Sequence, residues 1–143
     1  RECAAKREKN PATTRRTSNQ EASMATIELT GDTFNETIEH SDIVLLDFWA
    51  SWCGPCRSFA PIYESASNKH EDVVFGKVNT EEQQSLAAAF RIRSIPTLMI
   101  FKEGLPVFAQ PGLLPEAALD DLIEQVRGLD MDELRARMDE QAA

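Results

Sequence analysis

The sequence predicts one α/β domain, and three observations carry this prediction. The 143-residue chain is 42% apolar and 27% charged, a composition typical of a single domain with a buried core. From Met24 onward, strand and helix patterns alternate without an internal repeat or a low-complexity tract. The run Ile43 to Trp49 is almost continuously apolar, which is typical of a strand covered on both faces. We therefore expect this strand at the centre of the sheet.

The other elements follow in order from the spacing of apolar residues. Alternation of apolar and polar residues predicts strands, and apolar residues three or four apart predict helices. Pro61 lies inside a helix, where we expect a kink. Glu103 and Gly104 form a turn between two strands of an antiparallel hairpin, and Pro115 opens the helix that Gly128 caps. In order we expect a strand at 27–29, a helix at 32–38, strand 43–49, a helix at 53–70, a strand at 73–78, a helix at 86–90, strands at 97–101 and 107–109, and a helix at 115–127.

The two ends differ from this core in composition. Residues 1–23 contain no Val, Ile, Leu, Phe, Trp or Tyr, so we expect a disordered leader or an added extension before Met24. The globular unit is expected over residues 24–128. Residues 129–143 form an acidic C-terminal extension in which a capping-box spacing precedes Leu134 and Met138. We expect a short amphipathic helix there, marginal when isolated.

Charge, hydropathy and cysteine content exclude several classes of protein. The net charge of -9 disfavours binding to nucleic acid, which needs clustered Lys and Arg. The longest apolar runs are far shorter than the roughly 20 residues of a spanning helix, so we expect no membrane segment. Three cysteines are too few for the disulfide framework of a small secreted domain. A disulfide in this chain is therefore expected to perform chemistry.

The motif Trp52-Cys53-Gly54-Pro55-Cys56 joins the central strand to the next helix. At a helix N-terminus, Cys53 faces unpaired N–H groups and the positive end of the helix dipole, which favour a thiolate. Cys56 lies one turn deeper, close enough to form a disulfide but shielded from bulk substrate. Pro55 suits the first helical turn because no N–H is needed there. We expect Cys53 to be the nucleophile and Cys56 to be the resolving thiol.

Two other roles for this cysteine pair fit the pattern less well. A zinc site needs four ligands, and the remaining candidates, Cys3, His40 and His70, include no second close pair. Buried structural thiols disagree with Trp, Gly and Pro at a strand-to-helix junction, which favour an exposed loop. We therefore expect no metal and no cofactor. Cys3 is interpreted as a free thiol without a role, and both histidines as surface residues.

The motif and its surroundings resemble the thioredoxin family over about residues 27–126. The resemblance is carried by Asp-Phe-Trp-Ala-Ser-Trp-Cys-Gly-Pro-Cys at 47–56, Ala-Pro-Ile at 60–62, Lys-Val-Asn at 77–79, Ile-Arg-Ser-Ile-Pro-Thr at 92–97, Phe-Lys-Glu-Gly at 101–104, and Gly112. It implies the thioredoxin fold, a central mixed β-sheet flanked by α-helices. It also implies a protein that reduces protein disulfides and is re-reduced by a thioredoxin reductase. On this basis we expect a monomeric, cytoplasmic enzyme.

The resemblance also assigns a buried general base, and a charge beside it, to the site. Asp47 interrupts the apolar central strand, where an ionised carboxylate is costly to bury. By resemblance it is the buried acid near Cys56 that helps to deprotonate the resolving thiol, with Lys77 as a nearby charge. From the pattern alone, a solvent-exposed Asp at a strand end and a solvated Lys remain open.

A substrate surface is implied in the same way. The resemblance implies a cis peptide bond before Pro96, facing the two cysteines and exposing the Ile95 backbone to an extended substrate. An ordinary trans proline at a strand start is the alternative. The expected substrate-binding residues are Trp52, Gly54, Pro55, Ile95, Pro96, Gly112 and Leu113.

Three residues depart from the family pattern. Arg57 stands where the family usually has Lys, which keeps the charge beside the cysteines. Arg91 and Ser94 stand where glycines are common, so we expect a stiffer or differently charged substrate loop. Two other functions remain as hypotheses: a non-catalytic binding module that uses the same apolar rim, and a net oxidant of thiols.

Overall fold

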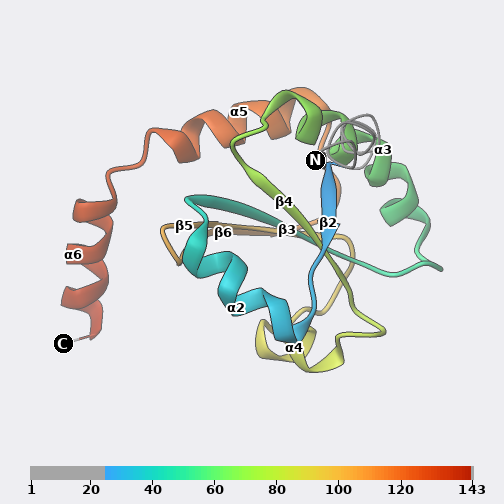
Figure 1. Ribbon diagram of the computed structural model, residues 1–143, viewed down its shortest axis with the longest axis horizontal. Coiled ribbons are helices and arrows are strands. Elements are labelled where there is room, and N and C mark those ends of the chain that lie inside the picture. Colours follow the sequence, from blue (N-terminus) through green and yellow to red (C-terminus); the bar gives the residue numbers. More distant parts are fainter. Residues whose placement is uncertain (1–24, 143) are drawn as a thin grey trace, which may run out of the picture.

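The computed structural model describes residues 25–142 and contains a five-stranded mixed sheet with helices on both faces (Figure 1). The strand order is β2-β4-β3-β5-β6, in which β2, β4 and β3 run parallel and β5 and β6 are antiparallel to their neighbours. The fold class predicted from the sequence is therefore confirmed. The strands are β2 (Thr26–Glu28), β3 (Ile43–Trp49), β4 (Val74–Asn79), β5 (Thr97–Lys102) and β6 (Leu105–Pro111). The expected leader, Met24 and Cys3 lie outside the described residues.

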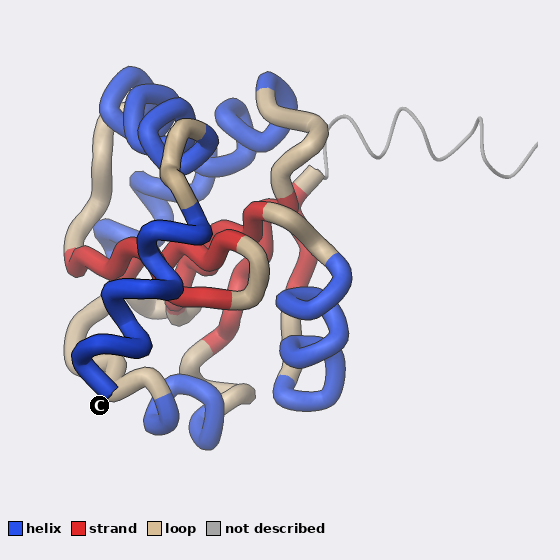
Figure 2. Tube along the Cα trace, turned by 90° about the vertical axis from the view of Figure 1, so that its left-hand side faces the viewer, coloured by secondary structure: helices blue, strands red, loops and turns tan. Residues whose placement is uncertain are grey.

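Two pairs of helices cover the two faces of the sheet. One face carries the long helices α3 and α5, and the other carries α2 and the short α4 (Figure 1). A further helix, α6, leaves the end of α5 and descends beside the β5–β6 end of the sheet (Figure 2). The helices are α2 (Gly31–His40), α3 (Gly54–Lys69), α4 (Gln84–Ala89), α5 (Glu116–Arg127) and α6 (Met131–Ala142). Within residues 25–142, every helix is too short or too polar to cross a membrane.

The central strand β3 decides which side chains reach the site. It pairs with β4 on one side and β5 on the other, and six of its seven residues are buried, as its apolar run predicts. Successive side chains alternate between the faces. Ile43 and Leu45 join the core under α3 and α5, whereas Val44 and Leu46 join the core around α2. By the same alternation Asp47 projects toward α3, the helix that carries Cys56.

Local signals in the sequence set several element ends. Glu103 and Gly104 both have positive φ, at 51° and 83°, and form the tight turn predicted for the β5–β6 hairpin. Helix α2 begins one residue before Asp32, at Gly31, because the Thr30 side chain caps it. The Thr30 hydroxyl accepts from the Thr33 N–H (3.3 Å), and the Thr33 hydroxyl accepts from the Thr30 N–H (3.0 Å).

Strand β6 is an edge strand of the sheet. Its only sheet partner among the described strands is β5, with Pro106 opposite Phe101 and Pro111 opposite Thr97. The register shifts between Ile100 and Phe101, which marks a bulge in the ladder. Both prolines lack the N–H that a strand residue would present to a neighbour.

The C-terminal segment is attached to the sheet by a buried lysine. Lys102 is 6% exposed, and its Nζ donates to the carbonyl oxygens of Val126 (2.8 Å), Arg127 (2.9 Å) and Leu129 (3.3 Å). Val126 and Arg127 end α5 and Leu129 follows it, where the regular helical donors run out, although the Val126 carbonyl also accepts from the Leu129 N–H (3.1 Å). The expected helix in the extension is present as α6. Its buried apolar residue is Met131.

The apolar residues that the sequence places on the α6 face, Leu134 and Met138, are only half-buried and exposed, respectively. Burial in this segment is confined to its first turn because Lys102 binds the chain just before it. An ion pair between Arg135 and Glu103 (2.8 Å) makes a second contact with the hairpin turn.

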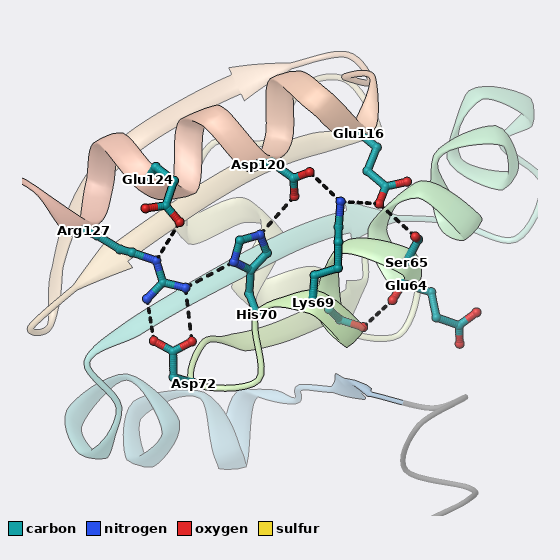
Figure 3. Close-up of polar contacts among 10 residues, drawn as sticks. Glu64, Ser65, Lys69, His70, Asp72, Glu116, Asp120, Glu124 and Arg127 are labelled. Atoms are coloured by element: carbon teal, nitrogen blue, oxygen red, sulfur yellow. Dashed lines mark hydrogen bonds and ion pairs between the residues drawn. The ribbon is translucent and has the colours of Figure 1, made fainter.

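The interpretation of His70 as a surface residue is wrong. Its side chain is only 11% exposed, because α3 ends against α5 and places the ring between two α5 side chains (Figure 3). Arg127 donates from Nη2 to His70 Nδ1 (3.1 Å), since a guanidinium cannot accept. Nε2 therefore carries the proton and contacts Asp120 Oδ1 (2.9 Å). His40 is exposed, as expected.

Candidate active site: the cysteine pair at the start of α3

The two cysteines of the motif lie where β3 passes into α3. Cys53 is the N-cap residue of α3 and Cys56 lies in its first turn, with Cα atoms 5.2 Å apart and a disulfide joining them. The Cys56 N–H donates to Cys53 Sγ (3.1 Å), and Pro55 occupies the first turn as the sequence predicts. A sulfur at this position receives a backbone N–H and the positive end of the helix dipole, both of which favour its anionic form.

Burial does not distinguish the two sulfurs. We expect an outward Cys53 and a shielded Cys56, but both residues are 4% exposed in the disulfide form. Cys53 is covered by the loop before β5, where its Sγ lies 3.7 Å from the carbonyl oxygen of Ile95. The asymmetry between the cysteines is therefore one of position on the helix and of hydrogen bonding.

Asp47 is enclosed in the sheet beneath this helix. It is 1% exposed, and burial raises the pKa of its carboxyl from the ordinary 3.8 to about 7. The charge of Lys77 opposes this rise, and the charge of Glu28 adds to it. Neither carboxylate oxygen has a hydrogen-bond partner among the described residues. The alternative of a solvent-exposed Asp at a strand end is excluded.

Lys77 lies opposite Asp47 in the register between β3 and β4. It is half-buried, and its Nζ is 4.9 Å from the ring centroid of Trp49, a cation–π distance. The alternative of a fully solvated outward Lys does not hold. Burial also raises the pKa of Glu28, one strand farther along the sheet, and Lys77 lowers it. Lys77 therefore lies between the buried carboxyl of Asp47 and the exposed carboxyl of Glu28 in the register of the sheet.

The loop before β5 faces the cysteines. The peptide bond between Ile95 and Pro96 is cis, as the resemblance implies, and Ile95 packs against the cluster that contains Cys53 and Cys56. The carbonyl of Pro96 accepts from the N–H of Gly112 (2.7 Å), whose φ of 95° suits a glycine. This bond holds the segment after β6 beside the cis peptide.

The remaining rim residues are exposed. Trp52 is 64% exposed, and Gly54, Pro55, Gly112 and Leu113 also face solvent. Gly54 and Pro55 directly follow Cys53 in the chain, and the bond from the Gly112 N–H to Pro96 holds the segment with Leu113 beside the loop that covers Cys53.

One neighbour of Trp52 is not predicted from the sequence. The Trp52 indole N–H donates to Glu81 Oε2, although the two residues are 29 positions apart. Glu81 follows the end of β4, which lies beside the end of β3 in a parallel pair. In a parallel pair, residues that follow the ends of neighbouring strands lie close together at one edge of the sheet. This rule could have identified Glu81 as a neighbour of Trp52 from the sequence. Among residues 25–142, no group of three or more His, Cys, Asp or Glu side chains is placed to hold a metal ion.

Comparison with known proteins places this site in a family. The family model described as Thioredoxin matches residues 25–125. A Streptomyces coelicolor protein named "Putative thioredoxin 2" is 58% identical over 119 residues, covering 83% of this chain and 89% of that protein. Thioredoxin 1 of Nostoc sp. is 43% identical over 103 residues, covering 71% of this chain and 96% of the relative.

A solved structure agrees with these sequence matches. The structure of a mutant thioredoxin from Halobacterium salinarum superposes with a TM-score of 0.68 at 37% identity, covering 73% of this chain and 93% of that one. The chain therefore belongs to the thioredoxin family, and it is a dithiol–disulfide oxidoreductase that reduces protein disulfides.

Proposed function

We propose that Cys53 is the attacking sulfur and Cys56 the resolving one. The Cys53 thiolate attacks one sulfur of a substrate disulfide, forms a mixed disulfide, and releases the other substrate sulfur as a thiolate. Cys56 then loses its proton and attacks Cys53 Sγ, which closes the disulfide seen in the structure and releases the second substrate thiolate. The substrate gains the two electrons that the cysteine pair loses. The observation that supports this order is Cys53 at the N-cap of α3, with its sulfur accepting the Cys56 N–H.

Asp47 is proposed as the base that takes the proton of Cys56. A group that shuttles a proton at neutral pH works best with a pKa near that pH, and burial brings the pKa of Asp47 to about 7. The alternation along β3 directs its side chain toward α3, the helix of Cys56. Lys77, opposite Asp47 in the sheet, is proposed to stabilise the ionised carboxylate.

The substrate is proposed to bind as an extended segment across the cis peptide. Ile95 and Pro96 contribute backbone beside Cys53, and the exposed rim formed by Trp52, Gly54, Pro55, Gly112 and Leu113 contributes apolar contact. Family membership implies disulfide-containing substrates and reductase partners in general.

A thioredoxin reductase as the electron donor, a cytoplasmic location and a monomeric state are proposals that rest on this chemistry. A dithiol that reduces disulfides must itself be kept reduced, which favours a reducing compartment. Turnover with purified reductases would test the donor. Cell fractionation and sedimentation would test the location and the monomer.

The order of attack is tested by two serine variants in a disulfide-reduction assay with dithiothreitol as the electron source. Cys53→Ser should abolish reduction, because no sulfur remains at the helix N-cap. Cys56→Ser should instead accumulate a mixed disulfide with substrate, visible by mass spectrometry and reversed by excess reductant. Normal turnover by Cys56→Ser, or a covalent adduct on Cys53→Ser, would contradict the assignment. Absence of any reduction by the unmodified protein would favour the non-catalytic binding module.

A further inference from the structure

Most cationic side chains in the described part of the chain are engaged within the molecule. Those in ion pairs, on backbone carbonyls or over an aromatic ring are Lys69, Arg127, Arg135, Arg137, Lys102, Arg57 and Lys77. Arg91 and Arg93 differ from this set. Both are exposed, and within residues 25–142 neither has a side-chain hydrogen bond or ion pair. Two positive charges are therefore available to a partner from one short segment.

This segment leads directly into the substrate loop. Arg91 and Arg93 lie four and two residues before Ile95, whose carbonyl oxygen is 3.7 Å from Cys53 Sγ. The backbone is held in place where it leaves α4, by bonds from the Arg91 N–H to Ala88 (3.0 Å) and from the Ile92 N–H to Ala87 (3.0 Å). Arg91 has a φ of 55°, a left-handed conformation that favours glycine. A long cationic side chain is thus carried at a position whose backbone does not favour it.

Both arginines line a surface pocket of about 240 Å³ beside the cis peptide. Its apolar lining comes from Ile92, Met99 and Pro111, among others, and Thr97 places it next to the start of β5. Part of this lining belongs to β6, the edge strand of the sheet. The pocket can therefore hold an apolar side chain of a bound peptide, while the guanidinium groups face the residues next to that side chain in the peptide.

The charge of this region contrasts with the rest of the molecule. The chain has a net charge of -9, and the rim on the other side of the cysteines carries Glu81, bound to the Trp52 indole. An acidic substrate is repelled by the molecule as a whole. Charge complementarity at Arg91 and Arg93 is what would bring an acidic segment to the cysteines.

We propose that Arg91 and Arg93, with the pocket between them and β6, form a recognition site for acidic residues flanking the substrate disulfide. This inference rests on the proposed function, and it specifies the class of substrate: extended protein segments in which Asp or Glu lies near the reactive cysteine. Carboxylates bind the guanidinium groups, and an adjacent apolar side chain enters the pocket. The site affects the choice of substrate and leaves the sulfur chemistry at Cys53 and Cys56 unchanged.

The test measures the single-turnover reduction of two disulfide peptides by pre-reduced protein, so that no reductase is needed. The peptides are identical except that Glu or Gln flanks the cysteine. We expect the protein to reduce the Glu peptide about fivefold faster at low ionic strength, in line with two exposed charge pairs. The preference should fall below about twofold at roughly 0.5 M salt, because screening then acts over a few ångströms.

Variants localise the preference. Arg91→Gln with Arg93→Gln should remove it, Arg91→Glu with Arg93→Glu should invert it, and Arg91→Lys should keep it. Arg135→Gln with Arg137→Gln is the matched control, because it also removes two positive charges, both on α6, where the residues pair with Glu103 and Glu133. Each preference is the ratio of the Glu-peptide rate to the Gln-peptide rate for one variant. A lower fraction of folded protein reduces both rates equally and leaves this ratio unchanged.

The outcomes separate this inference from the function on which it rests. Equal rates for both peptides in the unmodified protein, or an unchanged preference in the double Gln variant, would overturn the acidic recognition site while leaving the disulfide chemistry intact. Loss of the preference in Arg135→Gln with Arg137→Gln would also overturn it, since net charge alone would then explain the effect. Failure of the pre-reduced protein to reduce either peptide would overturn the proposed function itself.

Discussion

The described part of the sheet buries two charged residues, Asp47 and Lys102, in opposite ways. Lys102, at the end of β5, donates to three carbonyl oxygens at the end of α5. Asp47, in the middle of β3, has no hydrogen-bond partner among residues 25–142, and burial raises its pKa to about 7. Both residues are almost completely removed from solvent. The difference lies in the compensation that the surrounding structure provides.

This difference separates a structural charge from a chemical one. A buried ammonium group with three acceptors connects elements and stabilises their geometry. A buried carboxyl without partners destabilises the fold when it ionises. The same burial raises its pKa into the range that suits proton transfer near neutral pH. Replacing each residue by a neutral one should therefore have opposite effects on stability and on activity.

The largest effect is expected for Asp47→Asn, and it depends on pH. The pKa of Asp47 is raised in the folded state, so below about pH 4, where folded and unfolded chains are both protonated, its ionisation contributes nothing. The destabilisation grows as the pH rises toward 7 and is complete above it. The rise from 3.8 to about 7 corresponds to up to about 4 kcal/mol. Urea unfolding of Asp47→Asn and the parent should give equal stabilities near pH 4 and a more stable variant above pH 7.

Asp47→Asn should at the same time lose activity. We expect resolution by Cys56 to slow by about ten- to a hundredfold at pH 7, the usual contribution of a positioned base being at least of that order. The measurement is the steady-state rate of protein-disulfide reduction between pH 6 and 9, with reductant in excess so that re-reduction of the cysteine pair does not limit the rate. Rates equal to those of the parent across that range would leave Asp47 without a catalytic role, and a stability difference independent of pH would contradict its buried ionisation.

Lys102→Met should have the opposite result. The change removes the Nζ donor from three carbonyl oxygens, of which that of Val126 keeps the Leu129 N–H, and should reduce the free energy of unfolding by about 2 to 4 kcal/mol. Disulfide reduction per folded molecule should stay as in the parent, because Lys102 lies at the far end of β5 from the cis peptide. Thermal unfolding measures the expected loss of stability, and the reduction assay measures the activity per folded molecule. A loss of activity without a loss of stability would remove the distinction between the two buried charges.

The smallest effect is expected from deletion of residues 129–143. The deletion removes one of the three acceptors of Lys102 and the buried side chain of Met131, which lowers stability. It also removes the entropy cost of ordering these residues, which partly offsets that loss. We expect a loss of about 1 kcal/mol and unchanged reduction of disulfides. Met131→Ala in the full chain is the matched control and should reproduce most of the loss. A large decrease in activity would show that the extension belongs to the functional unit.

Features determined by local sequence were predicted well. The apolar run of β3, the Glu103–Gly104 turn and the proline within the first turn of α3 each depend on neighbouring residues, and each is confirmed. The cis peptide before Pro96 could be expected only from resemblance, because an X-Pro bond by itself is usually trans.

Contacts between distant residues were not predicted. His70 is enclosed by residues 50 and 57 positions later in the chain, and Trp52 binds Glu81 across the ends of two strands. The burial of Met131 in place of Leu134 and Met138 depends on where Lys102 holds the end of α5. Such contacts depend on how helices dock on the sheet, and periodicity within one helix carries no information about that.

The prolines of β6 have a consequence for how the molecule behaves in concentrated solution. An edge strand with regular unpaired N–H groups serves as a template on which another chain can add a strand, and repeated addition leads to aggregation. Pro106 and Pro111 interrupt that row of donors, and the bulge next to Pro106, where the register passes from Phe108 to Pro106, twists the strand locally. The β6 edge therefore resists β-sheet growth between copies, although the proposed substrate would itself bind as an extended segment beside Ile95.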